Sequence, residues 1–194
     1  MNADALSDLV LLLACVGSWW YAGVERPAWR GAMVLLGLAA ACGVLRFSGL
    51  EWALGPHRFA SLLAACVAFL LTLAALRWPQ GQLARRSSAV GRFVVLVGGV
   101  GVALSQILTP LWSQVIPGVS ALLVAWTMWQ MRSVMGMVFG AVLLASFAVA
   151  ALMPADALLA GLFNRTQAFH YLLALAVIGL GTVLARPSPS PVPA

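Results

Sequence analysis

The sequence FASLLAACVAFLLTLAAL, residues 59–76, runs for 18 residues without a charged side chain. An α-helix needs about 20 predominantly apolar residues to cross the ~30 Å hydrocarbon layer of a bilayer. The longest polar stretch of the chain, residues 77–88, follows this run directly. The run therefore predicts a helix that spans a membrane and ends in a polar loop.

Six further apolar runs of similar length lie on either side, separated by short polar or proline-containing breaks. The chain is 63% hydrophobic and 8% charged, whereas a soluble domain carries about 25% charged residues. Because one core cannot hide so much apolar surface from water, lipid must cover the rest. We predict an all-α bundle of seven transmembrane helices, over residues 6–22, 29–47, 59–76, 90–108, 110–130, 133–153 and 166–185. Residues 1–186 form a single domain in this prediction, and the Pro/Ser-rich residues 187–194 form a disordered, polyproline-like tail.

The arginines predict the orientation of this bundle. All eleven basic residues are arginines near the ends of the predicted spans, and none belongs to a basic run that would suggest a nucleic-acid partner. Cytoplasmic loops carry an excess of basic residues. Eight arginines lie on one side of the bundle, and three, Arg46, Arg58 and Arg165, lie on the other. We therefore predict an external N-terminus and a cytoplasmic C-terminus, in a bacterial inner membrane because the composition is rich in Ala and Leu and lacks lysine.

Polar side chains gather at the predicted external end of nearly every hairpin. A polar group at membrane depth is costly, so its position is informative. We predict an outward-facing pocket with five ligand-binding candidates, Arg46, His57, Gln106, Asn164 and Gln167. The alternative is that helix ends are polar because water is near. His57 follows Pro56 and lies in the predicted outer loop or at the start of the third span, and the spacing N-x-x-Q from Asn164 to Gln167 is typical of a helix-capping box.

Asp8 and His170 are the two candidate catalytic residues. Each lies about one turn inside its predicted span, the first and the last of the bundle. An Asp–His pair between these helices could serve as a proton-transfer pair, because a carboxylate orients an imidazole. It could equally be a structural hydrogen bond between helices, worth about 1 kcal/mol.

Small residues and cysteines have simpler interpretations. Gly136 and Gly140 form a G-x-x-x-G pattern, which lets helix backbones approach closely and predicts packing within the bundle rather than dimerisation. The three cysteines all lie in apolar runs and none forms a C-x-x-C pair, so we predict neither a disulfide nor a zinc knuckle.

Three stretches together resemble a known family. They are LSDLVLLL at residues 6–13, PAWRGAMVLLGLAAACGVLR at 27–46 and FNRTQAFHYLLAL at 163–175. Their order and spacing resemble bacterial seven-helix proteins related to the CREST superfamily of membrane hydrolases, which includes alkaline ceramidases and lysoplasmalogenase-like proteins. Asp8, Asn164 and His170 carry the specific part of the resemblance. It implies zinc held by histidines and an aspartate that assists attack of water on a lipid amide or related bond.

The chain departs from that pattern at the implied metal site. Ala174 stands where the family's H-x-x-x-H pair would place a second histidine, and Arg46 ends the second span where relatives often have one. A catalytic zinc takes three protein ligands, whereas this chain has two histidines. We therefore predict no metal and no other cofactor; zinc bound by Asp8, His57 and His170 is the disfavoured alternative.

These observations favour a non-enzymatic membrane component of CREST-like type: an accessory, scaffold or lipid- or ligand-binding protein. Its predicted partners are membrane lipids and other membrane protein subunits. The alternative is a membrane-embedded hydrolase that acts on a lipid-like substrate through the outward-facing polar site. The sequence leaves open whether any catalysis occurs, and a transporter is disfavoured because no charged path crosses the inner half of the bundle.

Overall fold

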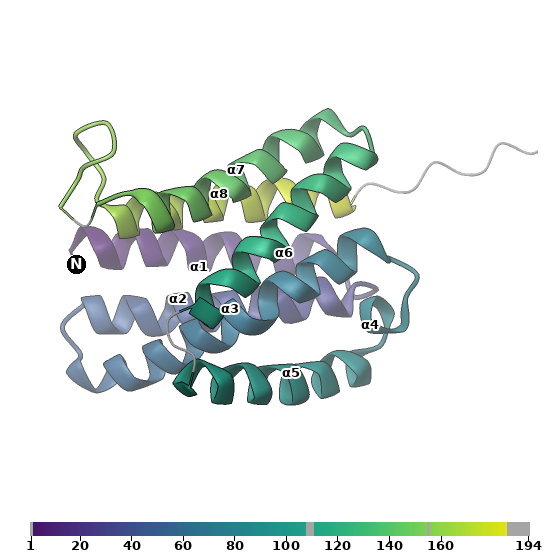
Figure 1. Cartoon of the computed structure of the whole chain (residues 1–194), viewed down its shortest axis with the longest axis horizontal. Coiled ribbons are helices and arrows are strands. Elements are labelled where there is room, and N and C mark those ends of the chain that lie inside the picture. The colour runs from purple at the N-terminus through teal and green to yellow at the C-terminus, as the bar shows by residue number, and fades with distance from the viewer. Residues whose placement is uncertain (1, 108–110, 155, 186–194) are drawn as a thin grey trace, which may run out of the picture.

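A computed structural model describes residues 2–107, 111–154 and 156–185, and within these ranges the chain is helical with no strand (Figure 1). The helices are α1 (Ala3–Tyr21), α2 (Pro27–Phe47), the 3-10 turn η1 (Glu51–Ala53), α3 (Leu54–Arg77), α4 (Gln82–Arg85), α5 (Ser87–Ile107), α6 (Leu111–Gln130), α7 (Val134–Leu152) and α8 (Arg165–Ala185). The tail predicted over residues 187–194 lies outside the described residues.

Six of the described helices are long and apolar enough to cross a membrane: α1, α2, η1 with α3, α5, α7 and α8. They coincide with six of the seven predicted spans to within a few residues at each end. Helix α6 occupies the region of the remaining predicted span and carries Pro117 in its interior.

Six of the described helices close into a ring. Along it, α1 packs against α2, α2 against α3, α3 against α6, α6 against α7, α7 against α8, and α8 returns to α1 (Figure 1). Helix α5 is not part of the ring; it packs chiefly against α3 from outside and forms the lower edge of the molecule in Figure 1. Because these six helices close into a ring, they enclose an interior.

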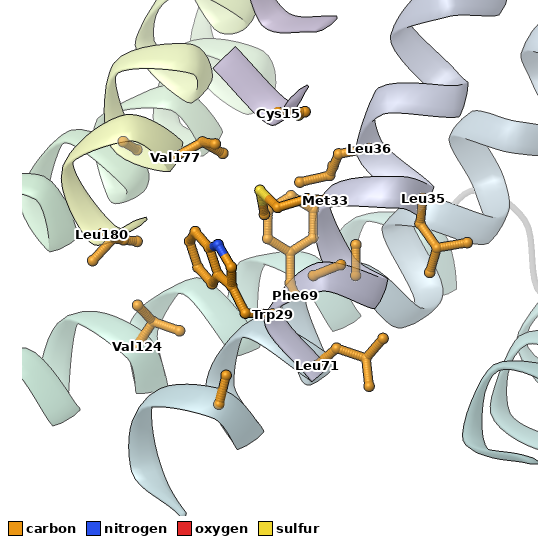
Figure 2. Packing of buried hydrophobic residues seen from close by; sticks show 14 of the residues in the cluster. Cys15, Trp29, Met33, Leu35, Leu36, Phe69, Leu71, Val124, Val177 and Leu180 are labelled. Atoms are coloured by element: carbon orange, nitrogen blue, oxygen red, sulfur yellow. The ribbon is translucent and has the colours of Figure 1, made fainter. Parts of the chain in front are cut away.

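One half of that interior is filled by a dense apolar core. Trp29 on α2 is fully buried, and Met33, Phe69, Val124 and Leu180 surround it from α2, α3, α6 and α8 (Figure 2). The indole Nε1 of Trp29 donates a hydrogen bond of 3.3 Å to the carbonyl oxygen of Ser18, so its one polar atom is satisfied. In lipid, close packing holds helices together through van der Waals contacts. The hydrophobic effect cannot do so there, because lipid tails are as apolar as these side chains.

The G-x-x-x-G pattern of α7 lies inside the bundle, as predicted. A Cβ atom added at Gly140 would lie 3.1 Å from the Cα of Ala125 on α6, and one at Gly136 would lie 2.8 Å from the sulfur of Met128. These glycines therefore set the distance between α6 and α7.

The structure places His57 at the start of the third long helix and not in a solvated loop. Helix α3 begins at Leu54, directly after η1, so His57 and Arg58 lie in its first turns. Pro56 does not prevent this, because the first N–H groups of a helix have no partner within the helix and proline lacks only that group. Ala53 is fully buried at this junction and anchors it.

Candidate functional site

A cavity of about 370 Å³ lies inside the ring. Every ring helix contributes to its wall, through residues such as Leu11, Ala39, Ala65, Pro117, Ala151 and Leu173. Helix α5 contributes none of the lining residues among those described. The size matches that of small-molecule sites, which run from about 300 to 1,000 Å³ and have mainly apolar walls with a few polar groups.

Three phenylalanines on three different helices connect the cavity to the core. Phe69 and Phe147 meet edge to face with ring centroids 4.9 Å apart, and Phe147 meets Phe169 in the same way at 5.8 Å. All three line the cavity, and Phe69 also belongs to the core in Figure 2. The cavity is therefore a pocket backed by a packed core.

Polar atoms enter the cavity wall at five residues: Asp8, His57, Ser61, Gln114 and His170. Two of them, Asp8 and His170, are the predicted catalytic candidates, and the structure brings them together. His170 Nδ1 lies 3.4 Å from Asp8 Oδ1 and 3.1 Å from the hydroxyl of Ser7. This contact links the first and last helices of the ring.

Asp8 is the one acidic or basic residue that is fully buried in the described part of the chain. Its Oδ2 has no hydrogen-bond partner among the described residues. The carboxyl group packs against Gly43 on α2, where an added Cβ would collide with it. A glycine at this place is what lets a carboxyl group fit between α1 and α2. Burying an unpaired carboxylate oxygen in an apolar site costs free energy. The Asp8 side chain therefore lowers the stability of the fold at this place.

The hydrogen bonds indicate which ring nitrogen of a neutral His170 carries the hydrogen. The Ser7 hydroxyl donates its only hydrogen to the carbonyl oxygen of Asp4, at 2.8 Å, so it can only accept from the imidazole. The carboxylate of Asp8 also only accepts. In the neutral imidazole, Nδ1 of His170 therefore carries the hydrogen, and Nε2 carries the lone pair and is the ring nitrogen left for the cavity.

His57 has the same arrangement on the neighbouring part of the wall. Its Nδ1 lies 3.2 Å from the carbonyl oxygen of Ala39 on α2. A carbonyl only accepts, so Nδ1 is the donor and Nε2 the acceptor. The edge of the Phe47 ring supports the imidazole, with centroids 6.0 Å apart.

The arrangement around His170 differs from a serine-protease triad. In a triad, the nucleophile and the acid contact opposite ring nitrogens of the histidine. Here Ser7 and Asp8 both contact Nδ1. These residues can therefore act chemically only as a single imidazole that a carboxylate orients.

Asn164 and Gln167 form the predicted capping box and do not line the cavity. The Gln167 amide N–H donates to Asn164 Oδ1 at 2.9 Å, and the Asn164 N–H donates to Gln167 Oε1 at 3.2 Å. Both side-chain amides also donate to Asp4 Oδ1, at 2.9 and 2.7 Å. They join the start of α8 to the start of α1 and so hold His170 beside Asp8.

Arg46 and Gln106 also lie away from the cavity wall. The Arg46 guanidinium lies over the ring of Phe47, 4.8 Å from its centroid, and so stands behind the His57 side of the site. Gln106 is exposed on α5, outside the ring. Only some of the polar residues at this end of the bundle therefore line the cavity.

Three residues of the site are absent from the sequence-based candidates: Ser7, Ser61 and Gln114. Ser61 follows His57 by four residues and shares its helix face, so a signal for it exists once His57 is placed on a helix. Gln114 is the fourth residue of α6, close to Thr109 and Ser113 in the sequence. Ser7 carries no signal of its own, because its neighbours come from α8.

No group of three or more His, Cys, Asp or Glu residues that could hold a metal ion occurs in the described ranges. Asp8, His57 and His170 line one cavity but do not form such a group. Comparison with known protein families, with curated proteins and with solved structures finds no match to this chain. The resemblance to the CREST superfamily therefore stays a prediction.

Proposed function

We propose that this chain is a seven-helix membrane protein whose ring binds a small, mainly apolar ligand without converting it chemically. The observation that carries the proposal is the cavity itself. All six ring helices line it, and five of its lining residues have polar side chains. These are the ordinary features of a ligand site.

The membrane arrangement that goes with this proposal has seven crossings. Helix α6 has 20 residues and packs between α3 and α7, which supports counting it as a span. The arginine asymmetry supports an external N-terminus in a bacterial cytoplasmic membrane. The end of the bundle at which Asp4, Arg46, His57 and Asn164 lie would then face outward. Lipids of the outer leaflet, or another membrane subunit carrying a ligand, are the proposed partners.

The volume limits the part of a ligand that fits. A volume of about 370 Å³ lies at the lower end of the range of small-molecule sites. A short-chain amphiphile or one segment of a lipid is of this size.

Filling the cavity tests the proposal. Ala65→Phe adds a ring to the cavity wall, while Leu38→Phe makes a comparable change on an exposed face of α2. Both variants are purified in nanodiscs, and the small molecules that stay with them are identified by mass spectrometry. We expect a bound amphiphile in the natural protein and in Leu38→Phe, and its loss from Ala65→Phe. Equal retention by a folded Ala65→Phe variant would overturn the proposal.

A hydrolase is the second candidate, and the orientation of His170 favours it. An imidazole whose Nδ1 is held by a carboxylate has Nε2 free to take a proton from water. The resulting hydroxide would attack an ester or amide carbonyl of a ligand in the cavity, the C–O or C–N bond would break, and the imidazolium of His170 would return its proton to the leaving alcohol or amine. Release of fatty acid from ester and amide probes, measured with the natural protein and with His170→Gln, separates this candidate from pure binding. Turnover that His170→Gln abolishes would establish the hydrolase.

A further inference from the structure

The polar part of the cavity wall consists mainly of hydrogen-bond acceptors. In the neutral rings, Nε2 of His170 and Nε2 of His57 each carry a lone pair. Nδ1 of His170 donates to α1, and Nδ1 of His57 donates to α2. Neither Nε2 has a hydrogen-bond partner among the described residues. The carboxyl group of Asp8 adds a third acceptor beside His170.

Hydrogen-bond donors are scarce in the same wall. Ser61 and Gln114 are the two lining residues, among those described, whose side chains can donate from a hydroxyl or an amide. No arginine lines the cavity in the described part of the chain, and the sequence has no lysine. Arg46 lies over Phe47 instead. The wall thus offers more acceptors than donors and no cation.

We propose that the cavity selects an amphiphile whose head group is a primary amine. This inference rests on the proposed ligand-binding function and names the class of ligand. A protonated amine presents three N–H donors and no acceptor, which suits a wall whose polar side chains are mainly acceptors. The alkyl chain lies against Phe69, Phe147 and Leu173.

Other head groups fit the wall less well. A carboxylate is acceptor-only and would meet the lone pairs of His57 and His170, and no arginine lines the cavity among the described residues. A hydroxyl supplies one donor and leaves at least one acceptor unpaired. Burying an unpaired polar group has a substantial cost, so the expected order of affinity is amine, then alcohol, then carboxylate.

Three probes with one chain length test this order: decylamine, decanol and decanoate. The full chain is reconstituted in phosphatidylcholine nanodiscs, and binding is measured from the ligand-dependent rise of the unfolding temperature. The same titrations on Ala65→Phe are subtracted, because they report effects of each probe on the bilayer. We expect decylamine to bind about tenfold more tightly than decanoate, the ratio that one additional charge-assisted hydrogen bond supplies.

A histidine variant assigns the selectivity to the wall. His57→Phe keeps an aromatic ring beside Phe47 and removes one acceptor, so it should lower decylamine affinity about tenfold and leave decanoate unchanged. Decanoate binding as tightly as decylamine to the natural protein would overturn the amine proposal, and this comparison does not depend on the His57→Phe variant. If both probes bind equally and Ala65→Phe abolishes both, the ligand-binding function stands while the amine selectivity fails. If no probe distinguishes the natural protein from Ala65→Phe, both proposals fail together.

Discussion

The contact between Gly43 on α2 and the carboxyl group of Asp8 on α1 predicts the effect of one added methyl group. A Cβ at position 43 would collide with that carboxyl group. Gly43→Ala must therefore push Asp8 away from its place and weaken its contact with Nδ1 of His170, now 3.4 Å away. The variant isolates the site without changing a polar residue.

The expected magnitude combines three terms. Overpacking a buried contact costs about 1–3 kcal/mol, and loss of a polar contact between membrane helices costs about 0.6 kcal/mol. Replacing glycine by alanine inside a helix returns about 1 kcal/mol. The net loss of unfolding free energy is about 0.6–2.6 kcal/mol, measured by reversible denaturation in mixed micelles.

Gly37 provides the matched control on the same helix. A Cβ there would lie 3.5 Å from Cys15 Cβ and 3.6 Å from Leu12 Cδ1, which are ordinary contact distances. Gly37→Ala should therefore leave stability unchanged or raise it by up to about 1 kcal/mol. The same substitution thus has opposite expected signs at two positions of α2.

A double-mutant cycle with Asp8→Ala identifies the cause. Once the carboxyl group is gone, nothing opposes the added methyl group, so Gly43→Ala should become neutral or stabilising. The expected coupling energy between the two positions is about 1–3 kcal/mol. If Gly43→Ala costs the same with and without the Asp8 side chain, the contact is not the reason and the description of the site is wrong.

Three other predictions concern separate parts of the chain. Asn164→Ala removes the cap of α8 and should cost about 1 kcal/mol, with faster amide exchange at Gln167, whereas Thr166→Ala on an exposed position should change neither; unchanged exchange would contradict the capping role. Trp29→Phe loses the 3.3 Å hydrogen bond to Ser18 and should lower the free energy of unfolding by about 0.5–1.5 kcal/mol, read from the denaturation midpoint. A reporter active only in the periplasm should be silent when fused after Ala194, and a bright fusion would reverse the orientation inferred from the arginines.

Some of the site can be predicted from the chain because its signals are local. The N-x-x-Q spacing alone predicts the cap of α8, since a capping box involves only four consecutive residues. The depth of Asp8 and His170 follows from counting residues inward from the helix starts. Residue counting makes a contact between them possible but does not require it, because the contact depends on α8 returning to α1.

Other parts of the site cannot be predicted because their partners are distant in sequence. Gly43 looks like any small residue of an apolar span, and its contact with Asp8 exists only once α1 and α2 are packed. The sequence predicts a loop at His57 because Pro56 precedes it, although proline is tolerated in the first turn of a helix. That error hides Ser61, which lies one turn further along the same face.

Apolar runs such as residues 59–76 are enough to predict helices that are long and apolar enough to cross a membrane, and their lengths and breaks define those helices. The order in which the helices pack is a property of the folded bundle alone: α1 to α3 and α6 to α8 close into a ring, while α5 stays outside. The physical reason is that hydropathy drives helices into a bilayer but does not choose their neighbours there. That choice depends on which surfaces fit together, and the cavity exists because six of them fit around it.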